Sequence, residues 1–337
     1  MKTAPKKDFL KIGNTKILPG ERKRVHLDVA ALFDFTELTI PVEVIRGKLR
    51  GPTMFISAAI HGDEINGVEI IKQILQKNIL SKLKGTLIVV PVVNIFGFNN
   101  KSRYLPDRRD LNRCFPGHAN GSLGSQLAHI FMKEIVSKCT HGIDLHTGAI
   151  HRVNLPQIRA CLDDAHTDEL AKCFGVPVII DSKLRDGSLR EAARKKKVTS
   201  LLFEGGQALR FEARVIKQGV RGCMAVMRKI GMLPPTKSRL HKPLTQVYVA
   251  KSSYWIRAPH SGSFRTVKII GDQIQTGELL AIVSDPFGNH PFEVNAEVGG
   301  IVIGISAIPL VNKGDAMIHV ATFSNSKRVK HAIEQNN

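Results

Sequence analysis

The chain has 337 residues, of which 43% are hydrophobic and 23% are charged, and its formal net charge at pH 7 is +20. This length suits one large domain with a smaller one, and this balance excludes a long disordered or fibrous protein. No apolar run approaches the roughly 20 residues that a membrane-spanning helix needs, so we expect no membrane partner.

The strong positive charge is compatible with nucleic acid or an anionic surface as partner. However, the basic residues are spread from Lys2 to Lys330, and aromatic residues make up only 6% of the chain. No stretch interleaves aromatic and basic residues as in a single-strand binder. The sequence therefore favours a small anionic substrate over nucleic acid.

The compartment is indicated by the amino end and the cysteines. Residues 1–8 contain no apolar stretch behind their positive charges, so we expect no secretory signal. The five cysteines are scattered and odd in number, and no pair forms a C-x-x-C motif. They are typical of free thiols in the reducing cytoplasm. A homo-oligomer is compatible with the sequence, which leaves the oligomeric state open.

The predicted elements follow one another in a clear order. The first are short strands, at residues 9–12, 24–29 and 38–45. From residue 53 to about residue 233, apolar strand-like runs (53–60, 86–93, 141–145, 176–180, 198–203) alternate with segments of helical periodicity (65–80, 122–138, 163–173, 212–230). This alternation predicts an α/β fold with a mixed, mostly parallel sheet flanked by helices. The second helix has two candidate starts, Ser122 and Ser125.

The composition changes after a linker rich in proline and lysine at residues 232–243. The segment that follows is all-β, and a weak internal repeat in it resembles the barrel of biotinyl and lipoyl carrier domains. Those carriers have a modified lysine between their halves, whereas this chain has Ser284–Asn289 without lysine, so a carrier function is not expected. We predict an N-terminal β segment, a catalytic domain, a C-terminal barrel-like β domain and a tail, at residues 1–45, 46–240, 241–325 and 326–337.

The first candidate site is His61-Gly-Asp-Glu64, which lies between the strand-like run 53–60 and the helical segment 65–80. A loop in this position lies at the carboxyl end of a strand, where open α/β sheets bind ligands. An imidazole and a carboxylate on such a loop can bind one zinc ion. The same H-x-x-E spacing also begins at His166, His290 and His331, but none of these follows a strand-like run.

Two further strand-like runs end in residues that handle metals or protons. Asp144 and His146 close one run, and Glu204 closes the other. Because the ends of parallel strands lie at one edge of the sheet, these residues can converge with His61 and Glu64. Two histidines and one carboxylate leave an open position on zinc, and a further glutamate can move protons.

Alternative interpretations remain for each of these residues. Glu64 could favour the first turn of its helix through the helix dipole, and His146 could be a hydrogen-bonded histidine at a strand end. Asp144 could hold a zinc-bound imidazole or cap a turn. Glu204, which precedes two glycines, could be an N-cap or a loop carboxylate.

A basic loop at residues 101–117 lies between the first two ligand segments. It carries four arginines, Arg103, Arg108, Arg109 and Arg113. Arginine recognises a carboxylate with two hydrogen bonds, and a positive charge beside a metal can polarise a carbonyl. A solvated basic loop is the alternative.

Four motifs in order now support a resemblance to a known family. The chain resembles the aspartoacylase and succinylglutamate desuccinylase family, which has the zinc carboxypeptidase-like fold, over roughly residues 40–325. The motifs are His61-Gly-Asp-Glu64, Asp110-Leu-Asn-Arg113, Asp144-Leu-His-Thr-Gly148 and Phe203-Glu-Gly-Gly206. The family's members differ from this chain at the position of Asp63, so the resemblance does not indicate the substrate.

The resemblance implies a role for each matching residue. His61, Glu64 and His146 would bind one zinc ion per chain. Glu204 would be the general base and acid, and Asn112 with Arg113 would hold the substrate carboxylate. Arg103 would stabilise the oxyanion, although two residues are inserted after it and Arg108 or Arg109 could compete for this role. The segment around Arg159 is similar to the deacylase-like relatives, which implies that Arg159 lines the substrate pocket.

From these motifs the sequence predicts a cytoplasmic zinc amidohydrolase that removes an acyl group from a small N-acyl amino acid carrying a carboxylate. Two alternatives remain open. A zinc carboxypeptidase would use the same metal and Arg113 on peptides, and a non-catalytic binder of nucleic acid or an anionic surface would account for the charge alone.

Overall fold

A mixed β-sheet runs through the computed structural model, which describes residues 8–31, 34–236 and 246–335. In its central part four neighbouring strands, β6, β5, β7 and β10, are parallel to one another. Their bounds are Lys84–Val90, Leu49–Ala58, His141–Gly148 and Thr199–Gln207. This arrangement confirms the predicted fold, a mixed and mostly parallel sheet within an α/β protein.

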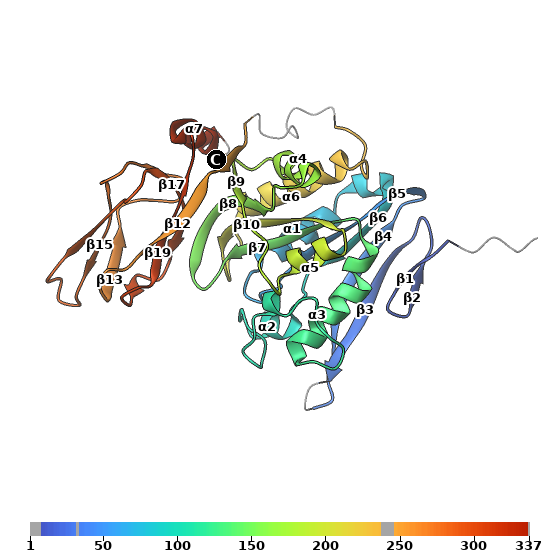
Figure 1. Cartoon of the computed structure of the whole chain (residues 1–337). Helices are drawn as coiled ribbons and strands as arrows, with labels where there is room; N and C mark the ends of the chain where they lie inside the picture. Colours follow the sequence, from blue (N-terminus) through green and yellow to red (C-terminus); the bar gives the residue numbers. More distant parts are fainter. Residues whose placement is uncertain (1–7, 32–33, 237–245, 336–337) are drawn as a thin grey trace, which may run out of the picture.

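Helices cover both faces of the sheet (Figure 1). One face is packed by α1 (Asn66–Leu75), α4 (Ala165–Phe174) and α6 (Ala213–Lys229), whose apolar side chains form one core with those of the sheet. The other face is packed by α3 (Leu123–Glu134) and α5 (Leu189–Lys195), with a second core. Each helix therefore buries one apolar side against the strands, as the helical periodicity predicts.

The helix ends correct two of the predicted ranges. Helix α3 begins after Ser122, whose Oγ accepts a hydrogen bond from the amide of Ser125 at 3.4 Å, so Ser122 is the N-cap. It ends at Glu134, and a short 3₁₀ helix, η3 (Val136–Lys138), follows. The predicted helix 65–80 is likewise divided into α1 and a 3₁₀ helix, η1 (Asn78–Lys82).

Several short elements were not predicted. They are strands β2 (Thr15–Ile17) and β8 (Arg152–Ala160), helices α2 (Ile95–Asn99) and α5, and the 3₁₀ helix η2 (Leu111–Arg113). Strand β8 contains Pro156, which argues against a central strand in sequence analysis because proline cannot donate to the ladder. The register between β8 and β10 shifts at Glu204 and Gly206, close to where this proline lies.

The N-terminal strands complete one edge of the same sheet. β3 (Arg22–Ala31) pairs with β4 (Glu37–Arg46), and β4 pairs with β6. Strand β1 (Leu10–Ile12) and β2 form a separate hairpin at the opposite end of the molecule from the C-terminal strands (Figure 1). The predicted segment 1–45 thus contributes to the central sheet, and residues 1–7, on which the absence of a signal was predicted, lie outside the described residues.

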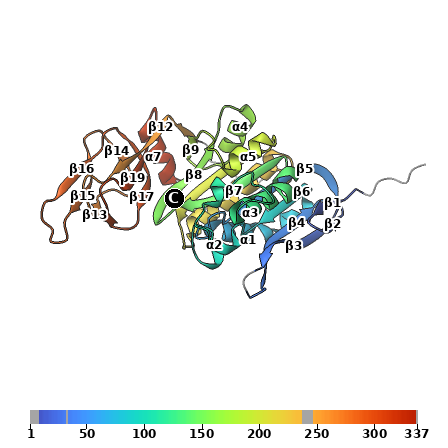
Figure 2. The same cartoon turned by 60° about the horizontal axis from the view of Figure 1, so that its bottom comes forward.

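The C-terminal part is all-β and barrel-like, as predicted. Two layers enclose a third apolar core, one made of β16-β15-β13-β18 and the other containing β12, β19, β17 and β14. The strands here are β11 (Tyr248–Ala250), β12 (Ser252–Arg257), β13 (Gly262–Thr266), β14 (Gln273–Ile274), β15 (Leu279–Ser284), β16 (Phe292–Asn295), β17 (Gly300–Ser306), β18 (Leu310–Val311) and β19 (Ala316–Thr322). Figure 2 shows this part at one end of the molecule, beside β8 and β9.

This C-terminal part is joined to the central sheet through strand pairing. β17 pairs with β8, and β11 pairs with β9 (Val178–Asp181). The tail forms helix α7 (Ser326–Gln335), which packs on a small core shared by β8, β9 and β17. The predicted boundary at 240–241 and most of the predicted linker lie outside the described residues, so the domain limits stay predictions.

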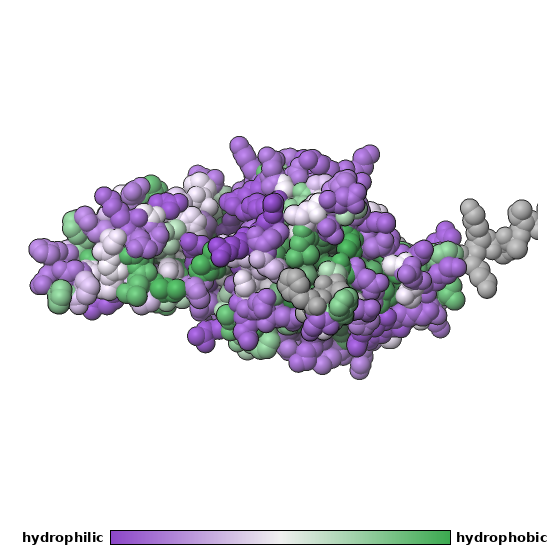
Figure 3. Space-filling view, turned by 90° about the horizontal axis from the view of Figure 1, so that it is seen from below, coloured by the Kyte–Doolittle hydropathy of each residue, from purple (hydrophilic) through white to green (hydrophobic). Residues whose placement is uncertain are grey.

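The surface agrees with a highly charged composition. Figure 3 shows hydrophilic side chains over most of one face, interrupted by apolar areas. Among the described residues, no helix combines the length and apolar character needed to span a membrane.

A glycine sets the distance between α1 and the strand ends. A Cβ atom on Gly67 would lie 2.7 Å from the Cβ atoms of both Ala58 and Leu145. Ala58 is the last residue of β5, and Leu145 lies near the end of β7. A larger residue there would therefore push the helix away. The close approach places the loop before α1 beside the end of β7.

Candidate functional site

His61, Glu64 and His146 converge at the carboxyl ends of β5 and β7. His61 and Glu64 lie in the turn between β5 and α1, and His146 lies in β7. One ligand atom from each of the three lies within 4.8 Å of the others, and all three side chains are buried. A Cβ on Gly62 would lie 1.9 Å from the backbone of Gly97, so this glycine allows the turn to pack tightly against α2.

The Glu64 carboxylate lies between the two imidazoles. Its Oε1 is 2.7 Å from Nδ1 of His61, and its Oε2 is 2.8 Å from Nδ1 of His146. The backbone amide of Thr147 also donates to Oε2 at 3.0 Å. Burial opposes ionisation of Glu64, but His61 and His146 outweigh it and hold the pKa of Glu64 well below its ordinary value.

A carboxylate lies behind each imidazole. Nε2 of His146 is 2.6 Å from Oδ2 of Asp144, whose Oδ1 accepts a hydrogen bond from Ser57 Oγ at 2.8 Å. Nε2 of His61 is 3.1 Å from Oδ1 of Asp110. Asp144 could hold the imidazole of His146 or cap a turn, and in the structure it contacts the imidazole of His146. The same role for Asp110 was not foreseen, because its partner His61 is 49 residues away.

These carboxylates also determine the proton balance of the cluster. Burial lowers the pKa of His146, but Asp144 and Glu64 outweigh it, and the pKa is raised well above that of an ordinary histidine. The pKa of His61 is raised in the same way, against its burial, by Glu64 and Asp110. A metal ion therefore has to displace protons from this cluster.

The donor set fits a divalent transition metal. Two imidazole nitrogens and a carboxylate oxygen are ligands that zinc uses, and three protein ligands leave a position open for water or substrate. Carboxylates behind ligating imidazoles fix the orientation and basicity of the rings, which is how such sites are usually supported. The residues present thus fit a single zinc ion held by His61, Glu64 and His146.

Glu204 lies on β10, directly beside His146 on β7, and lines the same cavity as the cluster. Its carboxylate is held by two residues of β8. Asn154 Nδ2 donates to Oε1 at 2.7 Å, and the Arg159 guanidinium forms an ion pair with Oε2. Arg159, which the resemblance to deacylase-like relatives places in the substrate pocket, therefore contacts Glu204 in this structure.

Two of the four arginines of the basic loop line the cavity. Arg103 donates to Oε1 of Glu64 at 3.1 Å and to Oδ2 of Asp110 at 2.8 Å. Arg113 lines the cavity, whereas Arg108 and Arg109 are not among the residues that line it. Of the three arginines that compete for the oxyanion role, Arg103 is the one beside the metal cluster.

Asn112 contacts a neighbouring helix. Its side chain is buried, and its Oδ1 accepts a hydrogen bond from the amide of Leu189 at 2.9 Å. Leu189 is the first residue of α5, so Asn112 fixes the start of this helix. Asn112 also lines the cavity.

Arg190, on α5, is a further residue that sequence analysis missed. It lines the cavity of about 170 Å³ together with the cluster, is only 8% exposed, and donates to Ser182 Oγ at 3.2 Å. Burial, together with the positive charge of Arg159, lowers the pKa of Arg190 to about 10. None of the ion pairs found among the described residues includes Arg190, whose two terminal nitrogens both donate to Ser182.

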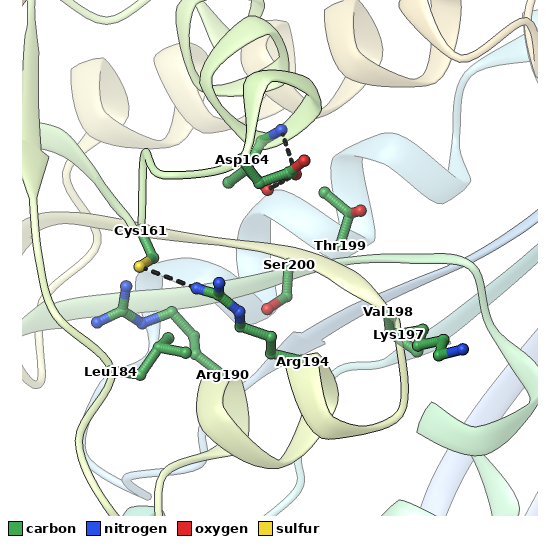
Figure 4. Close-up of a pocket in the computed structure, with 10 residues that line it drawn as sticks. Cys161, Asp164, Leu184, Arg190, Arg194, Lys197, Val198, Thr199 and Ser200 are labelled. Atoms are coloured by element: carbon green, nitrogen blue, oxygen red, sulfur yellow. Dashed lines mark hydrogen bonds between the residues drawn. The ribbon is translucent and has the colours of Figure 1, made fainter.

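A second cavity, of about 240 Å³, is also lined by Arg190 (Figure 4). In it Arg194 is directed toward Cys161 and pairs with Asp163, while Lys197 points away. None of the three residues of the metal cluster lines this cavity. The candidate active site is therefore the smaller cavity.

Comparison with known proteins gives a consistent result. A model of the succinylglutamate desuccinylase/aspartoacylase catalytic domain matches residues 50–230, more than half of the chain. The N-α-acetyl-L-2,4-diaminobutyric acid deacetylase of Halomonas elongata is 26% identical over 295 residues, which are 84% of this chain and 85% of the relative.

Solved structures show the same fold. A succinylglutamate desuccinylase/aspartoacylase from Rhodobacter sphaeroides has a TM-score of 0.80 and 24% identity, and the match covers 90% of this chain and 96% of that one. The product-bound ectoine utilization protein EutE from Ruegeria pomeroyi has a TM-score of 0.81 and 24% identity, with 90% and 97% coverage.

We predict that His146→Ala loses most of the bound zinc, because it removes one of three ligands. His166→Ala and His331→Ala should retain it, since both of these histidines are exposed and begin H-x-x-E sequences outside the cluster. Zinc per chain is measured by elemental analysis after dialysis. Equal retention by all three variants would contradict the ligand assignment.

Proposed function

Because this chain belongs to the succinylglutamate desuccinylase/aspartoacylase family, we propose that it is a zinc-dependent amidohydrolase that deacylates a small N-acyl amino acid carrying a carboxylate. The observation that carries this proposal is the single cavity that His61, Glu64, His146, Glu204 and several arginines line together. This reaction needs a metal site and a carboxylate that can transfer protons. It also needs cationic groups that bind an acid substrate.

In this proposal one zinc ion per chain is held by His61, Glu64 and His146. A bound zinc ion supplies a Lewis acid, which polarises an amide carbonyl and acidifies water. Arg103 lies beside Glu64 and provides positive charge where the carbonyl oxygen becomes negative. Asp110 holds the Arg103 guanidinium in place by accepting from its second nitrogen.

Glu204 is the proposed general base and acid. Its carboxylate removes a proton from the attacking water and then passes it to the nitrogen of the leaving amine. Asn154 and Arg159 restrict the rotation of this carboxylate by contacting one oxygen each. A base held in one orientation transfers protons more efficiently, because less reorganisation is needed in the transition state.

The arginines of the cavity support an anionic substrate. Arg113 and Asn112 would hold the carboxylate of the amino acid, and Arg159 would reach it from the sheet. Arg190, which is buried beside Ser182 and has no carboxylate partner within the described part of the chain, would provide a site for a second negative charge.

This distribution of charge favours a substrate with an acidic side chain over one with a cationic side chain. The deacetylase of Halomonas elongata is named for diaminobutyric acid, which carries a side-chain amine. In the cavity of this chain, the carboxylates of Glu64, Asp144 and Glu204 are all held by histidine or arginine partners. They are therefore not free to receive a cation, whereas Arg190 is hydrogen-bonded to Ser182 and forms no ion pair with a carboxylate among the described residues.

We also propose a cytoplasmic setting. The five cysteines are all free thiols, which suits the cytoplasm. A small anionic substrate accounts for the basic cavity, and we do not propose nucleic acid as a partner.

The proposal is tested by assaying zinc-loaded protein on N-acyl amino acids whose side chains are acidic, neutral or cationic, with free peptides in parallel. We expect the highest kcat/KM for an acidic side chain. Preference for peptides would establish the carboxypeptidase alternative instead, and a purified protein without stoichiometric zinc or activity would favour the non-catalytic binder.

We predict that Glu204→Gln retains zinc but loses turnover. The change keeps the size of the side chain and removes the proton acceptor, so kcat should fall by roughly 10²–10⁴-fold, as is typical of general acid–base catalysis. Zinc content and kcat are measured on the same preparation. Substantial zinc loss would make Glu204 a ligand rather than the base.

We also predict that Arg113→Lys harms an acid substrate more than its neutral amide analogue. Lysine keeps the charge but loses the planar fork that binds a carboxylate with two hydrogen bonds. A lost charge-assisted bond is worth about 1.5–3 kcal/mol, so the ratio of the two efficiencies should shift by roughly ten- to a hundredfold.

Arg109→Lys is the matched control. This side chain is 60% exposed and pairs with Asp107, so the ratio should hardly change. If acid and amide lose efficiency equally in Arg113→Lys, Arg113 does not bind the substrate carboxylate.

A further inference from the structure

The C-terminal strands are connected to the proposed base by a row of residues that are register partners on neighbouring strands. Gly304 on β17 lies opposite Asn154 on β8, and it also lies opposite His319 on β19. His319 in turn lies opposite Trp255 on β12. The row therefore leads from the outer strand β12 to Asn154, which donates a hydrogen bond to Glu204 at 2.7 Å.

Gly304 is required by space rather than by backbone conformation, because its φ lies outside the left-handed region. A Cβ atom at this position would lie 2.8 Å from Asn154 Oδ1, 3.1 Å from His319 Cβ and 3.6 Å from Trp255 Cη2. The side chains of Asn154, His319 and Trp255 thus surround the glycine. This packing supports Asn154 from the side opposite to Glu204.

The outer part of this row is a stacked aromatic pair. The rings of Trp255 and His319 lie 4.4 Å apart at an angle of 10°, and the Arg152 guanidinium lies 5.0 Å from the centre of the Trp255 ring. Burial, followed by the charges of Arg159 and Arg152, lowers the pKa of His319 to about 3. His319 is therefore neutral near pH 7, and the pair supports Asn154 by packing alone.

Asn154 has few alternative orientations. It is 5% exposed, its Nδ2 is committed to Glu204, and its Oδ1 finds no hydrogen-bond donor among the described residues. The packing around Gly304 therefore determines where the amide lies. A shift of this amide would release Oε1 of Glu204 and leave Arg159 as the remaining contact of that carboxylate.

We infer that the C-terminal β region is part of the catalytic apparatus: through the packing over Gly304 it holds Asn154, a positioning residue that orients Glu204. This inference rests on the proposed role of Glu204 as the base. It gives the C-terminal strands a direct function in the reaction, in addition to closing the edge of the sheet.

Asn154→Asp provides the first measurement, because it keeps the shape of the side chain and removes the donor. We expect kcat to fall by about ten- to a hundredfold, which is the effect of losing one hydrogen bond to a charged group. KM and bound zinc should stay within about twofold of the unchanged protein. A purely structural role would instead lower the unfolding temperature while leaving kcat of the folded protein unaltered, and that outcome would overturn the inference.

Gly304→Ala tests the connection from a distance. The added methyl group would displace Asn154, so kcat should fall although the change lies on β17, which β8 separates from β10 and Glu204. Gly300→Ala is the matched control on the same strand, since its Cβ would lie 2.4 Å from the backbone oxygen of Ala321, away from Asn154. The control should lose stability without losing kcat, and an equal loss of kcat in both variants would contradict the proposal.

A double-mutant cycle completes the experiment. If Gly304 acts through Asn154, adding Gly304→Ala to Asn154→Asp should change kcat by less than about twofold, whereas independent effects would multiply. Should Gly304→Ala fail to fold, Trp255→Leu replaces it, because it removes the support on the same side and carries the same expectation.

Glu204→Gln separates this inference from the proposed function. If that variant keeps full turnover, Glu204 is not the base and the inference falls with it. If Glu204→Gln is inactive while Asn154→Asp and Gly304→Ala keep full kcat, the proposed function stands and only the role of the C-terminal region is refuted.

Discussion

The structure depends most on the burial of one carboxylate. Glu64 is 1% exposed, and an ionised group at such a depth is stable only when charged or hydrogen-bonding partners surround it. Two imidazoles and the amide of Thr147 provide this environment, and the Asp144 and Asp110 carboxylates fix the imidazoles from behind. The ends of β5 and β7 and the start of α1 therefore have to meet within a few ångströms, which constrains the packing of the central sheet.

Much of this arrangement could be predicted from the chain. The alternation of apolar runs and helical periodicity gave the layers of the fold, because burial on one side of a helix leaves a regular pattern. His61, Glu64 and His146 were found because each follows or ends a strand-like run, and strand order brings such ends together. Ser122 could be foreseen as a helix start, although only the hydrogen bond to Ser125 distinguishes it from the alternative.

The residues that sequence analysis missed depend on contacts between distant segments. Strand β8 carries Pro156 and α5 has only seven residues, so neither has a clear pattern. Arg190 resembles many other arginines of this basic chain, and only its burial beside Ser182 distinguishes it. The pairing of Arg159 with Glu204 likewise arises from the register of β8 against β10, which local sequence does not encode.

The hydrogen bond between Asn112 and the start of α5 has a practical consequence. The candidate metal ligands and Glu204 lie on β7 and β10 and in the turn that follows β5. Arg190 lies instead on the short helix α5, which this hydrogen bond attaches to the basic loop. In the proposed function, substitutions in α5 would therefore change the contacts of the substrate acid while leaving the cluster of His61, Glu64 and His146 in place. The proposed substrate contact on Arg190 and the candidate metal ligands thus lie on separate elements, which makes α5 the segment to exchange when a different substrate acid is to be tested.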